Sequence, residues 1–84
     1  MITQHNGWFG AFTRGTARDA IPSGVAIRKV NSEPGDAHPD GTCGVVLGSF
    51  RDATVRDGAL VYFIEWDGHP RMAVGTMGWK VERA

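Results

Sequence analysis

The chain lacks most of the features that mark disulfide-stapled, membrane-spanning and strongly basic proteins. Its single cysteine, Cys43, excludes an intramolecular disulfide and fits a reducing compartment. Nine basic and nine acidic residues cancel, so the positive excess that gives most nucleic-acid binders their phosphate affinity is missing. No apolar run approaches the roughly 20 residues of a membrane span, and the N-terminus shows no basic, apolar leader. These absences predict a cytoplasmic protein without a membrane partner.

The composition instead favours one small all-β domain. The chain has 84 residues, and a hydrophobic fraction of 42% is enough for a compact core. Twelve glycines and four prolines are many turn formers for this length. Because many turns in a short chain leave room only for short strands, we expect a small antiparallel sheet.

Residues 1–20 are predicted to form a loosely structured N-terminal segment. Glycines interrupt it, and no helical or strand period is sustained. It nevertheless carries an aromatic cluster, Trp8, Phe9 and Phe12, which a freely solvated tail seldom has. Two interpretations stay open: the cluster packs on the following domain as an extra strand or flap, or it docks on a partner.

Residues 21–84 are predicted to form the folded domain, with five short strands between turn-forming residues. The expected strands are Val25–Val30, Thr42–Phe50, Leu60–Trp66, Arg71–Val74 and Trp79–Glu82. Leu60–Trp66 carries apolar residues on both faces and is expected to be the central strand, buried on much of both sides. Almost every residue of Asn31–Gly41 is a turn former, which indicates one long loop. Interior glycines in the second strand indicate a bend or bulge, and Gly75–Gly78 suits a 3₁₀ turn.

Two short motifs resemble known small barrels. The segment Gly41–Val46 is similar to the glycine-spaced strand of KOW-type and PsaE-like barrels. The segment Tyr62–Gly68 resembles the central strand of chromodomain and Tudor-like proteins. The chain therefore resembles the SH3-like small β-barrel superfold over roughly residues 21–82. The resemblance implies a single five-stranded antiparallel barrel.

The chromodomain and Tudor-like resemblance implies an aromatic cage for methylated lysine, which attracts the cation through ring faces. Tyr62 and Trp66 share one face of their strand by period-two spacing, and Trp79 is the third candidate. The same rings are also the largest core formers of the chain. Their role in a cage or in the core alone stays open, with the core interpretation favoured.

The KOW-like resemblance implies an RNA-binding face as an alternative. The candidate contacts are Arg28, Lys29, Arg51, Arg56 and Arg71. Interspersed acidic residues and the balanced charge disfavour nucleic acid, because a solvated surface of mixed charge has the same composition.

A third resemblance concerns oligomeric enzymes. Ile27–Lys29 and Val45–Gly48 look like the corresponding strands of type II dihydrofolate reductases, which are tetrameric SH3-like barrels with a central pore. The Val-Gln-Ile-Tyr pore motif of that family is absent, and Met72–Gly75 stands near its place. What remains is an alternative: an oligomeric barrel that forms a small-molecule or catalytic site at a subunit interface.

The long loop also contains potential metal ligands. Asp36, His38 and Asp40 alternate before a glycine, but the twelfth position of a calcium loop would be Leu47 and not glutamate. We therefore expect no metal and no cofactor, and Cys43 is expected to be a half-buried structural cysteine.

The sequence favours a non-enzymatic interaction module that binds a protein partner. The long loop, with Asp36 and His38, and the N-terminal segment are the expected recognition elements, since exposed loops on a stable scaffold commonly carry function.

The role of the N-terminal aromatics has a direct test. If Trp8 packs on the domain, Trp8→Ala should lower the free energy of unfolding by about 2–4 kcal/mol, as truncation of a core aromatic does. Urea denaturation measures this quantity. Equal stability of the full chain and a chain that starts at Ala20 would instead support the docking interpretation.

Overall fold

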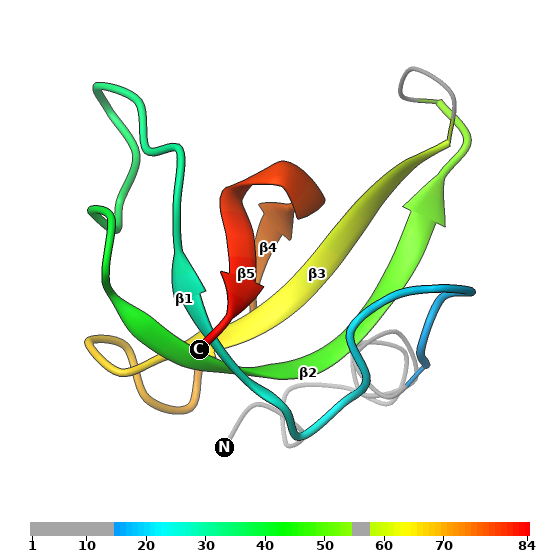
Figure 1. Ribbon diagram of the computed structural model, residues 1–84, viewed down its shortest axis with the longest axis horizontal. Coiled ribbons are helices and arrows are strands. Elements are labelled where there is room, and N and C mark those ends of the chain that lie inside the picture. Colours follow the sequence, from blue (N-terminus) through cyan, green and yellow to red (C-terminus); the bar gives the residue numbers. More distant parts are fainter. Residues whose placement is uncertain (1–14, 55–57) are drawn as a thin grey trace.

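The computed structural model describes residues 15–54 and 58–84, which form an all-β fold (Figure 1). The strands are β1 (Ala26–Lys29), β2 (Cys43–Asp52), β3 (Ala59–Trp66), β4 (Val74–Met77) and β5 (Val81–Arg83). A short 3₁₀ helix, η2 (Gly78–Lys80), joins β4 to β5. In the described part of the chain, no helix is long and apolar enough to cross a membrane.

The five strands form one antiparallel sheet in the order β4-β3-β2-β1-β5. The long strands β2 and β3 bend strongly, so that β4 and β5 lie over the concave side of the sheet (Figure 1). Among the described residues, no strand pairing joins β4 to β5. The sheet is therefore curved and is not closed into a barrel by hydrogen bonds.

A bulge in β2 accounts for part of this bend. Val46 pairs with Ile64, whereas Gly48 pairs with Phe63, so Leu47 is one extra residue on the β2 side. Such a bulge strengthens the local twist and lets a long strand turn a corner. The bend expected from the interior glycines is confirmed.

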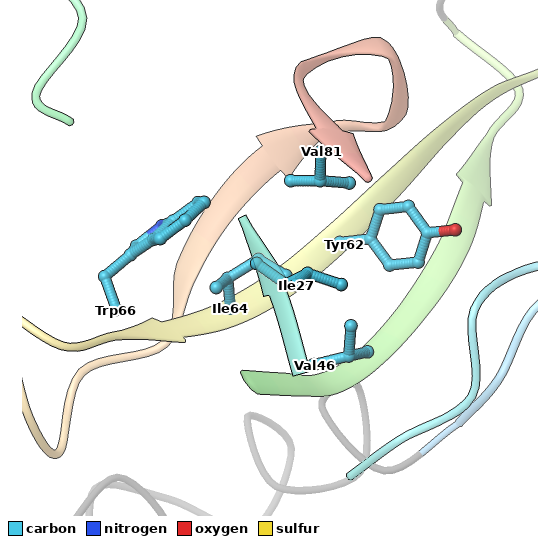
Figure 2. Packing of buried hydrophobic residues seen from close by; sticks show 6 residues of the cluster. All are labelled: Ile27, Val46, Tyr62, Ile64, Trp66 and Val81. Carbon is cyan, nitrogen blue, oxygen red and sulfur yellow. The ribbon is translucent and has the colours of Figure 1, made fainter. Parts of the chain in front are cut away.

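The core lies on the concave side of the sheet (Figure 2). Its buried hydrophobic residues are Ile27, Val46, Tyr62, Ile64, Trp66 and Val81. Alternate residues of β3 point into it, as the period of a strand requires. The residues between them, on the opposite face, are only partly buried, so the expected burial is complete on one face only. The expectation that this strand is central is wrong, because β2 lies in the middle of the sheet. On that second face Phe63 stacks on Phe50.

The described end of the N-terminal segment, residues 15–20, is bonded to β2. Ser49 accounts for two of these bonds: its N–H donates to the carbonyl of Gly15 over 2.7 Å, and its hydroxyl accepts from the N–H of Ala17 over 2.9 Å. The N–H of Ile21 donates to the hydroxyl of Tyr62 over 2.9 Å. These bonds give the buried hydroxyl groups partners and hold the chain against the sheet before β1 begins.

The last third of the chain differs from the sequence prediction. The fourth strand is Val74–Met77 and not Arg71–Val74, and Trp79 lies in η2 and not in a strand. The turn after β3 is longer than expected because Arg71 takes a positive φ of 67° and its N–H donates to the Glu65 carboxylate. A residue in that conformation cannot continue a strand.

Gly44 supports a prediction about the packing of β2 against β3. An added Cβ would lie 2.8 Å from the carbonyl oxygen of Glu65 and 3.0 Å from Cε3 of Trp66. Because β2 would have to move away from β3, Gly44→Ala should lower the free energy of unfolding by about 1–3 kcal/mol. Urea denaturation followed by tryptophan fluorescence measures the change.

Gly68→Ala is the matched control, because nothing lies within 4 Å of a Cβ added at that turn position. It should leave stability within about 0.5 kcal/mol. Equal effects of the two substitutions would contradict the proposed close approach at Gly44.

Candidate functional site

A buried lysine organises the long loop between β1 and β2. Lys29 ends β1 and points to the same side as Ile27, and only 4% of it is exposed. Its Nζ donates to the Ser32 hydroxyl over 2.7 Å, to Oδ2 of Asp36 over 2.9 Å and to the carbonyl of His38 over 3.2 Å. A lysine ammonium has three protons, so each proton has an acceptor within the loop.

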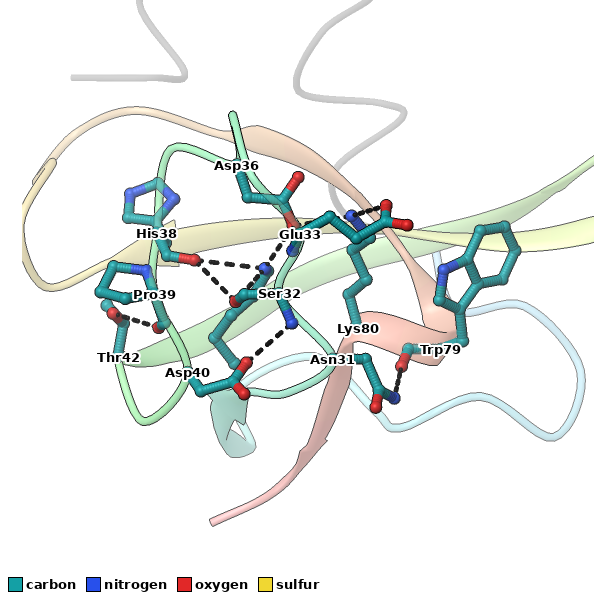
Figure 3. A network of polar contacts seen from close by, with 11 residues as sticks. Asn31, Ser32, Glu33, Asp36, His38, Pro39, Asp40, Thr42, Trp79 and Lys80 are labelled. Carbon is teal, nitrogen blue, oxygen red and sulfur yellow. Dashed lines mark hydrogen bonds and ion pairs between the residues drawn. The ribbon is translucent and has the colours of Figure 1, made fainter.

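Asp36 joins this lysine to the other end of the chain. Its Oδ2 also accepts from Nζ of Lys80 over 2.7 Å, and Lys80 in turn reaches Oε1 of Glu33 over 3.1 Å (Figure 3). The hydrogen bonds from Lys80 and Lys29, with that from the N–H of Glu33, hold the pKa of the Asp36 carboxyl far below its usual range. The same bonds with Asp36 and Glu33 raise the pKa of Lys80. We call Lys29, Glu33, Asp36 and Lys80 the loop brace.

Further polar contacts complete the loop. Oδ1 of Asp40 accepts from the N–H of Ser32 over 2.8 Å, and bonds from Ser32 lower the pKa of that carboxyl. Nδ2 of Asn31 donates to the carbonyl of Trp79 over 2.7 Å (Figure 3). The segment predicted as a long loop is therefore a cross-linked structure tied to β1 and η2.

A histidine pair connects the loop to the turn after β3. The His38 ring stacks on Trp66 with 4.9 Å between centroids, and its Nε2 lies 2.8 Å from Nδ1 of His69. Only 7% of His38 is exposed. Burial, with His69 and Lys29 nearby, lowers the pKa of His38. The pair can share one proton in its bond, but two protonated rings would have no acceptor there.

A cleft of about 280 Å³ separates the loop from β4. One wall is β4 itself, and the other is the loop from Gly35 to His38. The lining residues are Lys29, Gly35, Asp36, Ala37, His38, Val74, Gly75, Thr76, Met77 and Lys80. Two residues predicted as binding candidates, Asp36 and His38, thus lie together at one cleft.

The aromatic residues predicted as binding candidates lie in different parts of the structure. Tyr62 and Trp66 are buried in the core, and His38 covers one face of Trp66. Trp79 is 57% exposed on η2. The three rings therefore do not line one open pocket in this structure. The remaining candidates, Trp8, Phe9 and Phe12, lie outside the described residues.

The basic residues predicted to contact nucleic acid also lie in different surroundings. Arg28 forms an ion pair with Glu82 on the outside of the sheet, whereas the neighbouring Lys29 is buried in the loop brace. Arg51 donates to main-chain carbonyls, and Arg71 lies exposed on the turn after β3. Arg56 lies outside the described residues. No common basic face is formed by the four that are described.

Two features of the structure were not predicted from the sequence. The partners of Asp36 and His38, namely Lys80 and His69, come from distant segments, and no spacing pattern signals such pairs. The expectation of a half-buried Cys43 is wrong: its side chain is exposed on the outer side of β2. Within residues 15–54 and 58–84, no cluster of three histidine, cysteine or carboxylate side chains is placed to hold a metal ion.

Comparison with known proteins identifies no relative, so a functional argument depends on the geometry described above. No protein-family model, no curated protein and no solved structure matches the chain.

The lowered pKa of His38 predicts a pH dependence of stability. The unfolded chain takes up a proton near the ordinary value of 6.5, whereas the folded protein resists it down to a lower pH. Stability is therefore full above that value and falls as the pH decreases through the folded pKa. Urea midpoints measured from about pH 7 to about pH 5 should decrease.

The variant His38→Gln, which cannot take up a proton, should show a flatter pH profile over the same range. An unchanged slope in this variant would place the proton uptake elsewhere.

Proposed function

We propose that the chain is a non-enzymatic protein-binding module of the SH3-like barrel kind. The strand order β4-β3-β2-β1-β5, with a 3₁₀ turn before the last strand, supports the barrel assignment. The curvature of β2 and β3 supports it as well (Figure 1).

The observation that carries the proposal is an exposed tryptophan on a rigid support. Trp79 is 57% exposed, although its backbone carbonyl is held by Asn31 and the next residue, Lys80, belongs to the loop brace. The indole therefore projects from a fixed position beside the loop (Figure 3). Tryptophan is enriched among the residues that dominate protein interfaces, since it buries a large area with little loss of side-chain freedom.

The polar groups beside this surface support binding over catalysis. Oδ2 of Asp36 accepts from two ammonium groups, and Nε2 of His38 faces Nδ1 of His69. A general acid or base must reach the substrate proton with its own polar atoms, and these atoms already have partners within the fold. For the nucleic-acid alternative, the dispersal of Arg28, Lys29, Arg51 and Arg71 supplies no focused positive surface.

The proposal is tested by the substitution Trp79→Ala. Binders are selected from a phage-displayed library of folded and unfolded protein fragments, and affinities are measured by calorimetry. Trp79→Ala should weaken the selected binders by roughly tenfold or more, as loss of an interface hot spot does. Stability should hardly change, because the side chain is mostly in solvent.

Met72→Ala is the matched control, because Met72 is also exposed, at 52%, but precedes β4 on another loop. It should leave affinity unchanged. Failure to select any fragment, or equal affinity for the wild type and Trp79→Ala, would contradict the proposal. Selection of RNA with strong salt dependence would favour the nucleic-acid alternative, and a stable oligomer in light scattering would favour the shared-site alternative.

A further inference from the structure

Strand β4 has one unused side. Among the described residues it lies at the edge of the sheet and pairs with β3 alone, through Val61, Tyr62, Phe63 and Ile64. No main-chain hydrogen bond joins its other side to any residue of the described ranges. The free edge of a strand presents alternating N–H and C=O groups that form a template for another chain.

The cleft lies between β4 and the long loop. All residues of β4, Val74–Met77, line the cleft, and Gly35, Asp36, Ala37 and His38 form the facing wall. The loop brace holds that wall to β1 and η2. The space therefore lies between a strand with one side unpaired among the described residues and a wall that is anchored elsewhere.

Gly75 in the middle of β4 is not explained by the fold itself. Its φ is not positive, and nothing lies within 4 Å of a Cβ added there. Neither backbone strain nor internal packing therefore requires glycine at this position. Glycine inside a strand weakens the strand and often marks a place where a ligand or another backbone approaches closely. The wall opposite is also built from small residues, since Gly35 and Ala37 are part of it.

A spare hydrogen-bond donor in the lining favours an acidic ligand. Two lysines, Lys29 and Lys80, line the cleft with one carboxylate, Asp36. The protons of Lys29 all have acceptors, but Lys80 has two, Glu33 and Asp36, and no third among the described residues. One N–H of Lys80 is thus available to a ligand carboxylate.

We propose that an extended peptide segment with an acidic side chain adds as a strand to β4 inside this cleft. Its backbone bonds to the free edge of β4, and its carboxylate accepts from Lys80. Strand addition of this kind draws affinity from main-chain hydrogen bonds and specificity from alternate side chains. The inference rests on the proposed protein-binding function and names the class of partner.

The test uses a phage-displayed library of random ten-residue peptides, followed by synthesis of the selected sequences. Selected peptides should contain an aspartate or glutamate, and their exchange for the amide should weaken binding several-fold. In the complex, amide hydrogen exchange within Val74–Met77 should slow by roughly tenfold or more, since new bonds protect the edge. Unprotected β4 amides in a tight complex would overturn the inference.

Gly75→Val places a branched side chain in the middle of β4, where no described residue lies within 4 Å of the added Cβ. It should weaken peptide binding by roughly tenfold or more, while amide spectra show an unchanged fold. Gly68→Val is the matched control, at a glycine that is equally open but lies in the turn after β3. Equal affinity of the wild type and Gly75→Val would place the peptide elsewhere.

N-methylated peptides give a readout that depends on no protein variant. Methylation of alternate residues should abolish binding for the set whose N–H groups face β4 and spare the other set. Equal tolerance of both sets would exclude strand addition. Fragments that lose affinity for Trp79→Ala but bind Gly75→Val normally would retain the proposed function and remove this inference alone.

Discussion

A lysine ammonium inside the fold is the constraint on which the rest of the structure depends. Moving a charge out of water costs several kcal/mol unless it is paired and hydrogen-bonded. Lys29 meets this requirement only if the chain after β1 folds back, so that Ser32, Asp36 and the carbonyl of His38 surround its Nζ. The conformation of the long loop therefore follows from satisfying one buried charge more than from apolar contact.

The same carboxylate couples the loop to the C-terminal part of the chain. Because Asp36 accepts from Lys80 as well as from Lys29, η2 is held against the loop, and Trp79 beside it has a fixed position. The His38 ring adds a second attachment through Trp66 and His69. None of these attachments uses the backbone of β4. The loop thus stands opposite β4 without pairing with it, and this leaves the cleft between them.

Two glycines of the sheet differ in their surroundings: one lies at a close contact between strands and the other at an open position. Glycine is required at position 44, where β2 pairs closely with β3, because any side chain would meet Glu65 and Trp66. A Cβ added at Gly75 has no described residue within 4 Å. The first glycine belongs to a close approach that the core needs, and the second leaves a backbone accessible at the free edge. From the sequence alone, Gly44 indicates a bend within a strand and Gly75 a break after one, since the neighbours of a glycine appear only after the strands are paired.

The sequence by itself determined the all-β class, the position of β2 and β3 and the bend in β2, because alternation and glycine spacing are local signals. It also marked Asp36 and His38 as residues of the loop between β1 and β2. The fourth strand begins later in the chain than the sequence predicts. No local pattern indicates the positive φ of Arg71 or its bond to Glu65. Only the tertiary structure decided that Lys29 is internal, that Lys80 and His69 meet the loop, and that β4 keeps a free edge. These outcomes depend on contacts between segments far apart in the chain, and their geometry exists only once the sheet has curved.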